Sequence, residues 1–262
     1  ILMICSNYDA FALEEDGRIE NQVKNEYREL NLSNPPKFIW ANSSAQARDI
    51  IGSEEDIDMI ICMYNEQDKE IFPFASRLKD EGRVIPFILL IHYSKAVRQR
   101  VLESQHPGVD FVFSWHGNAD LILAIVKLLE DAANAENDVF DVVVKAILLF
   151  EDSIRYYSNY LPELYKIVLT QSREFLTESL NDDQKKYRKR SRPKIFLATC
   201  LEEAIAYFEK YRRNLLGVIS DVGMVFHKGD DPKTENLDAG LDLVRILREY
   251  DHLIPVLLQS SQ

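Results

Sequence analysis

The fold is decided by the stretch LLGVISD, residues 215–221. It is an almost uninterrupted apolar run of strand length that ends on an acidic residue. Such a run is typical of a strand that is covered on both faces, as in a parallel sheet. A second run, AILLF at residues 146–150, is followed at once by Glu151 and Asp152. The sequence therefore predicts two buried parallel strands whose carboxyl ends are acidic.

Short apolar runs alternate with longer amphipathic stretches along the rest of the chain. This rhythm predicts βαβ units and an α/β fold with parallel sheets. The predicted strands cover residues 1–4, 37–41, 57–63, 86–91 and 109–113, and then 146–150, 195–198, 215–220 and 255–259. The predicted helices cover residues 44–51, 71–79, 95–104, 119–132, 201–211 and 237–250, with a further long helix that begins near Ser153.

The two halves of the chain repeat one another. Residues 1–6 (ILMICS) correspond to residues 147–152 (ILLFED), and similar matches join the third and fourth strands of each half. A polar stretch at residues 134–138 separates the two halves. We therefore expect two doubly wound domains with strand order 2-1-3-4-5, at residues 1–134 and 135–262. The second domain is expected to carry a long helical insertion and to lack its last strand and helices.

The composition excludes several classes of function. The chain has 262 residues and a formal net charge of −12. This charge argues against sequence-independent binding of nucleic acid and against docking on anionic membranes. No apolar run reaches the roughly 18 residues of a membrane span, and no signal peptide is visible. Three widely spaced cysteines form neither a disulfide framework nor a zinc motif. A cytoplasmic protein is expected.

Acidic residues follow two strands that the order 2-1-3-4-5 makes neighbours. Glu151 and Asp152 follow the first strand of the second half, and Asp221 ends the third. Ligands of doubly wound sheets bind at this point. Carboxylates so close together disfavour joint ionisation, and Mg²⁺ would relieve the conflict. Asp221 is then the candidate nucleophile for a phosphoryl group, and Ser260 the candidate hydroxyl donor. The alternative is that these acids are only polar loop residues.

These motifs resemble the receiver domains of two-component response regulators. The resemblance rests on the acidic pair after residues 147–150, the apolar strand that ends in Asp221, Met224 three residues later, the stretch DAGL at 238–241 and the run from Ile254 to Ser260. It implies a flavodoxin-like fold and a Mg²⁺ site.

The resemblance also assigns roles to individual residues. It implies that Glu151, Asp152, Asp221 and the backbone carbonyl of Gly223 bind Mg²⁺. It further implies that a histidine kinase or a small phosphodonor phosphorylates Asp221, and that Ser260 is the switch hydroxyl. The family's lysine after the fifth strand has no counterpart in this sequence.

The first half departs from the receiver pattern at each chemical position. Cys5 and Ser6 replace the acidic pair, Met63 replaces the phosphoacceptor, Ile91 replaces the switch hydroxyl and Trp115 replaces the lysine. The first half is therefore interpreted as a pseudo-receiver. Its cysteines are interpreted as small apolar fillers of an empty pocket rather than as a redox pair.

More narrowly, the chain is similar to the front part of bacterial proteins that join two receiver-like domains to a phosphoenolpyruvate synthase-like (pyruvate, phosphate dikinase-like) region. The similar stretches are residues 4–11, 113–120 and 216–221. This similarity implies a C-terminal effector region and a fragment that is not itself an enzyme.

Other interpretations stay open. Both halves could form an interaction scaffold with a vestigial pocket, and the helical segment at 154–192 could form a homodimer contact. A phosphatase of the haloacid dehalogenase type is disfavoured because Gly223 stands where a second aspartate is needed. Seven basic residues at 185–194 are interpreted as a solvated helix end. His227 is interpreted as a surface loop residue.

Overall fold

The computed structural model describes residues 1–14, 18–29, 34–53, 56–92, 106–177, 192–228, 230 and 234–260. The chain divides into two compact units, Ile1–Leu123 (unit 1) and Ala124–Gln262 (unit 2). The division falls inside helix α6 (Ala119–Glu136), which also contains the boundary expected at residue 134. The two units are described separately.

Unit 1 is built on a five-stranded sheet in the order β2-β1-β3-β4-β5. The strands are β1 (Leu2–Ile4), β2 (Ile39–Ala41), β3 (Ile60–Met63), β4 (Phe87–His92) and β5 (Phe111–Trp115). All four strand pairs are parallel. The expected α/β class and strand order 2-1-3-4-5 are confirmed.

The helices of unit 1 fill the connections between these strands. They are α1 (Asn7–Glu14), α2 (Arg18–Glu29), α3 (Ser44–Gly52) and α4 (Ile71–Asp80), and α6 follows β5. The Ser43 hydroxyl caps α3 by accepting a hydrogen bond from the Gln46 backbone N–H. The first crossover consists of two helices, which the sequence did not specify. The helix predicted at 95–104 lies outside the described residues.

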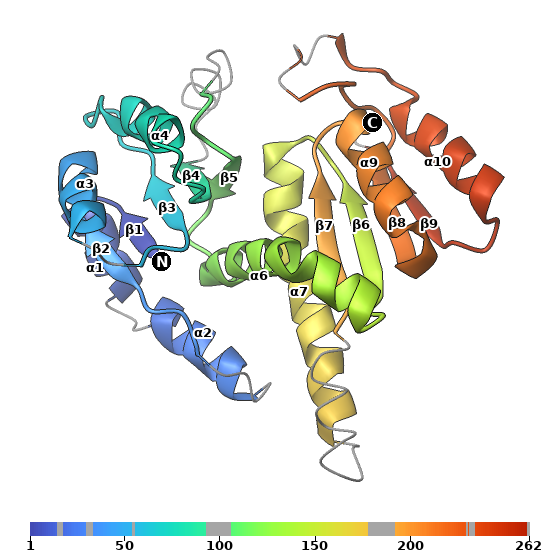
Figure 1. The fold of residues 1–262 in the computed structure, drawn as a ribbon, viewed down its shortest axis with the longest axis horizontal. Helices are drawn as coiled ribbons and strands as arrows, with labels where there is room; N and C mark the ends of the chain where they lie inside the picture. The colour runs from blue at the N-terminus through green and yellow to red at the C-terminus, as the bar shows by residue number, and fades with distance from the viewer. Residues whose placement is uncertain are drawn as a thin grey trace. The chain divides into compact units, whose positions relative to one another are not determined.

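Unit 2 is built on a four-stranded parallel sheet in the order β7-β6-β8-β9. The strands are β6 (Ala146–Phe150), β7 (Lys194–Ala198), β8 (Leu215–Asp221) and β9 (Val256–Gln259). The helices are α7 (Ile154–Thr177), α9 (Leu201–Tyr211) and α10 (Ala239–Tyr250). The connections β6–β7 and β7–β8 cross the sheet in opposite directions, so right-handed crossovers place α7 and α9 on opposite faces (Figure 1).

One face of this sheet packs against α9 and α10. Leu148, Phe196 and Val218 from the strands form one buried cluster with Phe208 of α9 and Leu247 of α10. Each of these side chains is at most 2% exposed. The sheet is therefore covered by helices, as the apolar strands predicted.

Helical structure covers the polar stretch at residues 134–138. Helix α6 continues to Glu136, and a π-helix follows at Asn137–Asp141. Ala135 and Val139 belong to the buried cluster of unit 2. The polar stretch that separates the two repeats is therefore helical, and Ala135 and Val139 anchor it in unit 2.

Helix α7 confirms the long helix expected after Ser153, as far as the described residues extend. Its buried positions run along one face as far as Leu169, and none of residues 170–175 is buried. The helix therefore extends beyond the sheet that it covers. The rest of the insertion, residues 178–191, lies outside the described residues. Within the described part of the chain, no helix is long and apolar enough to cross a membrane.

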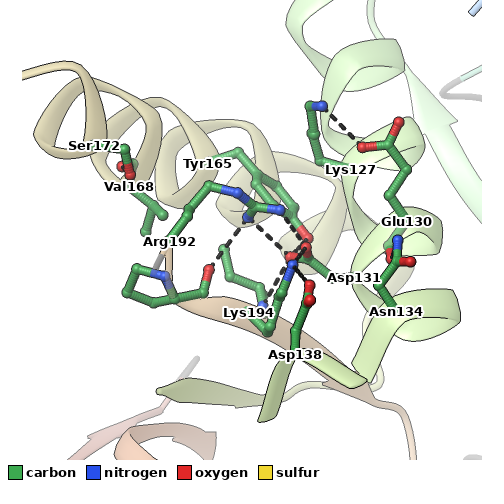
Figure 2. A network of polar contacts seen from close by, with 12 residues as sticks. Lys127, Glu130, Asp131, Asn134, Asp138, Tyr165, Val168, Ser172, Arg192 and Lys194 are labelled. Atoms are coloured by element: carbon green, nitrogen blue, oxygen red, sulfur yellow. Dashed lines mark hydrogen bonds and ion pairs between the residues drawn. The ribbon is translucent and has the colours of Figure 1, made fainter. Parts of the chain in front are cut away.

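A buried polar network joins α6, α7 and the start of β7 (Figure 2). Asp131 of α6 is fully buried and lies 3.0 Å from Nη1 of Arg192 and 3.4 Å from Nζ of Lys194. It also accepts hydrogen bonds from the Tyr165 hydroxyl at 2.9 Å and the Ile195 backbone N–H at 3.1 Å. These donors supply the partners that a buried carboxylate needs.

This network corrects the interpretation as a solvated helix end for Arg192 and Lys194, the two basic residues of the segment 185–194 that the structure describes. Their side chains are only 11% and 9% exposed. They are not solvated, because Asp131 draws both of them into the unit. Lys194 also pairs with Asp138 at 2.5 Å.

Candidate functional site

The carboxyl ends of β6 and β8 bring three acidic residues together. Phe150 pairs with Ser220 in the parallel register, so the residues that follow each strand meet at one edge of the sheet. One carboxylate oxygen each from Glu151, Asp152 and Asp221 lies within 4.8 Å of the other two. The structure thus places side by side the three acids that the sequence analysis put at adjacent strand ends.

The packing of α10 against the end of β8 fixes the backbone of Asp221. A Cβ atom on Gly240 would lie 2.1 Å from the backbone oxygen of Asp221. The Gly240 backbone N–H donates to the carbonyl of Val222 at 2.9 Å. Only a residue without a side chain lets the first turn of α10 approach so closely. The stretch DAGL therefore serves a packing purpose at the site.

A fourth acid, Glu235, approaches the same cluster from the loop between β8 and α10. Met224 and Asn236 form an antiparallel bridge that folds this loop back on itself. A Cβ atom on Gly223 would lie 2.2 Å from Oε1 of Glu235. The glycine therefore makes room for the Glu235 carboxylate. Glu235 is not predicted from the sequence as a site residue, because an acid in a polar loop gives no local signal.

The crowding of acids shows in the pKa of two of them. Glu151 is 2% exposed, and its burial, followed by the charges of Asp221, Asp152 and Glu235, raises its pKa to about 8. The hydrogen bond that its Oε1 accepts from the Ser153 N–H at 3.0 Å opposes this shift. Burial, followed by the charges of Glu235 and Asp221, raises the pKa of Asp152 to about 6. Near neutral pH the site therefore retains a proton on Glu151.

An aromatic pair on α7 lies beside the acids. The rings of Tyr156 and Tyr160 are stacked with centroids 5.9 Å apart. Burial, followed by the charge of Glu151, raises the pKa of the Tyr160 hydroxyl, and the charge of Asp221 contributes. The spacing of four residues places the two tyrosines on one face of the helix. Because α7 begins just after the end of β6, its first turns lie close to the acids.

Two other candidate residues are not part of this acidic cluster. Ser260 follows β9 and is exposed, and it is Gln259 that pairs with Asp221 in the register. The structure therefore leaves the switch role of Ser260 as a prediction. His227 is exposed, and its Nδ1 lies 2.9 Å from Oε2 of Glu202. This contact raises the pKa of His227 and holds the residue at the surface.

The corresponding edge of unit 1 has a different character. Ile4 pairs with Cys62, and Cys5 and Cys62 are 4% and 0% exposed. Burial raises the pKa of the Cys62 thiol above its ordinary value, so the thiol stays protonated and unreactive. This fits the interpretation of the cysteines as small apolar fillers. Nearby, Asp68 accepts hydrogen bonds from the backbone and side chain of Ser44, each at 2.8 Å.

The cluster in unit 2 offers hard oxygen ligands in a site that is partly shielded from water. Carboxylates of this kind suit Mg²⁺ or Ca²⁺ rather than a metal that prefers nitrogen or sulfur. Glu151, Asp152 and Asp221 are the residues that could hold such an ion. No protein-family model matches the chain, and no curated protein matches it.

Proposed function

We propose that this chain is a phosphoacceptor signalling module in which Asp221 takes a phosphoryl group with the help of Mg²⁺. The proposal is carried by the convergence of Glu151, Asp152 and Asp221 within 4.8 Å. Their place at the carboxyl ends of neighbouring parallel strands supports it, because open α/β sheets bind their ligands there.

The charge of the site supports a bound cation. The raised pKa values of Glu151 and Asp152 reflect burial and mutual repulsion, and a divalent cation relieves the repulsion. Glu151, Asp152, Asp221 and the backbone carbonyl of Gly223 are the proposed ligands. When bound, Mg²⁺ supplies charge neutralisation for the incoming phosphoryl group.

In the proposed reaction, a carboxylate oxygen of Asp221 attacks the phosphorus atom of the donor. The new oxygen–phosphorus bond forms as the bond to the leaving group breaks, and the leaving group departs with that electron pair. The product is an aspartyl phosphate. The donor is the phosphohistidine of a histidine kinase or a small molecule such as acetyl phosphate. With acetyl phosphate the leaving group is acetate.

The output is proposed to be a conformational switch. Ser260 donates its hydroxyl to the phosphoryl group, and the resulting repacking changes contacts with an attached C-terminal effector region. By the resemblance, that region is of the phosphoenolpyruvate synthase type. The chain itself is then a regulatory module and not an enzyme. The cytoplasm is the proposed location, since none of the three cysteines forms a disulfide.

The position of Glu235 favours a second candidate function. Its carboxylate stands over Gly223 and adds a fourth anion at the place where a phosphoryl dianion would have to approach. A site with four carboxylates repels the donor more strongly than a site with three. In this second function, the cluster holds a cation and stabilises an interaction scaffold without being phosphorylated.

The test uses the whole chain and two measurements. Calorimetric titration with Mg²⁺ is expected to give saturable binding that Asp152→Asn abolishes. The matched control is Glu202→Gln, which removes an exposed carboxylate of the same unit and leaves the cluster intact. Intact mass after incubation with Mg²⁺ and acetyl phosphate is expected to show one phosphoryl group, which is absent in Asp221→Asn.

Each outcome decides between the candidates. Binding of Mg²⁺ without an adduct favours the scaffold. A phosphoryl adduct that persists in Asp221→Asn shows that another residue is phosphorylated and refutes the role of Asp221 as phosphoacceptor. Failure to bind any divalent cation overturns both functions.

A further inference from the structure

Unit 1 contains a small pocket between α3 and α4, with an apolar floor and a basic rim. Its volume is about 150 Å³. Ile51, Phe74 and Leu78 line it and are 6%, 2% and 4% exposed. Its rim also carries three arginines and one acid, Glu81. The arginines are Arg48 of α3, Arg77 of α4 and Arg83, which follows α4.

The backbone at the end of α4 places the third arginine. Gly82 has a φ of 72°, the left-handed conformation that commonly ends helices. The N–H groups of Gly82 and Arg83 then donate to the carbonyls of Lys79 and Leu78, at 2.9 and 3.0 Å. These two carbonyls already have backbone donors, so arginine side chains are not needed to cap them. Of the three guanidinium groups, that of Arg77 already donates from Nε to the Pro73 carbonyl at 3.4 Å and from Nη2 to Glu70 at 3.0 Å.

The existing ion pairs at the rim are weak. Arg77 lies 3.0 Å from Glu70 and Arg83 lies 3.7 Å from Glu81, and the side chains of both pairs are at least 44% exposed. Exposed pairs of this kind contribute little and exchange readily with other anions. Arg48 forms no ion pair within the part of the chain that the structure describes. The rim therefore carries an excess of positive charge, in a chain whose net charge is −12.

The size of the pocket limits the ligand. Pockets for drug-sized ligands and cofactors have volumes of roughly 300–1,000 Å³, so a whole nucleotide is too large. Guanidinium forks match the geometry of carboxylate and phosphoryl groups, and the floor provides an apolar contact. We infer that this pocket binds a small organic anion, a carboxylate or phosphoryl group on a short apolar stem.

The test titrates the whole chain with defined probes and follows the arginine Nε–H and Phe74 amide signals by NMR. Propyl phosphate and butyrate carry both features of the ligand and distinguish a phosphoryl from a carboxylate preference. Propanol lacks the charge and inorganic phosphate lacks the stem, so both are expected to bind more weakly. Saturable shifts are expected at Arg48, Arg77 and Arg83.

Two variants at exposed positions, Arg48→Gln and Arg83→Gln, locate the binding site. Each is expected to raise the dissociation constant of the charged probes about tenfold, because each loses one charge-assisted hydrogen bond to the probe. The matched control is Arg28→Gln, an exposed arginine in the last turn of α2, which is expected to leave binding unchanged. The inference is overturned if neither charged probe saturates, or if the affinity stays the same in both pocket variants. This test is independent of the metal site in unit 2.

Discussion

Replacing Asp131 by asparagine removes the charge at the centre of the buried network in unit 2. Asp131 is fully buried and lies 3.0 Å from Nη1 of Arg192 and 3.4 Å from Nζ of Lys194. Asparagine has nearly the same shape and keeps one acceptor oxygen for the Tyr165 hydroxyl or the Ile195 N–H. The variant therefore isolates the loss of the negative charge.

The cost follows from the two cations left behind. Breaking a buried ion pair by removing one partner costs about 3–5 kcal/mol. Lys194 keeps Asp138 at 2.5 Å, and the side chain of Arg192 is 11% exposed, so the lower end of about 3 kcal/mol applies. With a urea m value of about 2 kcal/mol/M, the midpoint of unfolding falls by about 1.5 M.

Urea unfolding followed by far-UV circular dichroism measures this change. Both tryptophans, Trp40 and Trp115, belong to unit 1, so tryptophan fluorescence follows unit 1 separately. The matched control is Glu136→Gln, which breaks an exposed pair with Lys210 at 2.7 Å and is expected to leave the midpoint unchanged.

The reasoning is refuted if Asp131→Asn unfolds at the same urea concentration as the control. A second refutation comes from the double variant with Arg192→Gln. If the network acts as a unit, the two changes together cost less than their sum, because the first already breaks the pair. Strict additivity would show that Asp131 and Arg192 are not coupled.

Three further predictions concern the acidic site. In the folded protein the pKa of Glu151 is raised from its ordinary value of 4.5 to about 8. The contribution of its protonated form to stability is therefore complete below pH 4.5 and is lost as the pH rises through about 8. The melting temperature of the metal-free protein should fall from pH 6 to pH 8, and it should fall less in Glu151→Gln. Gly240→Ala should lower the free energy of unfolding in urea by about 1–3 kcal/mol through overpacking, and it should weaken Mg²⁺ binding by moving the backbone of Asp221. The control Gly52→Ala, whose added Cβ meets nothing within 4 Å, should leave stability and Mg²⁺ binding unchanged. Equal effects of the two substitutions would contradict the packing argument. Glu235→Gln should weaken Mg²⁺ binding roughly tenfold in calorimetry by removing one nearby anion, and unchanged affinity would remove Glu235 from the site.

The strands and their acidic ends could be predicted from the sequence because buried parallel strands leave a continuous apolar pattern. The run that ends at Asp221 and the run before Glu151 follow this rule, and the strand order then places the acids together. The local pattern predicts the strands and their acidic ends, whereas the proximity of the acids follows from the strand order.

The missed features depend on contacts between distant residues. Arg192 is 61 positions from its partner Asp131, so the basic segment reads as a solvated surface when taken alone. Glu235 reaches the site only because Gly223 leaves space for its carboxylate. The stretch at 134–138 reads as polar, yet Val139 just beyond it is 0% exposed. A local pattern shows none of these partners.

Helix α6 sets a limit on how the protein can be dissected for experiments. A fragment that begins at residue 135, the boundary expected from the sequence, would omit Asp131. Arg192 would then lose its buried carboxylate partner, and Lys194 would keep only Asp138. A fragment that begins at Ala124 retains Asp131 and the buried positions that follow it. Expression trials of the isolated second unit should therefore start at or before Ala124, and failure of the shorter fragment would report on the missing helix, not on the phosphoacceptor site.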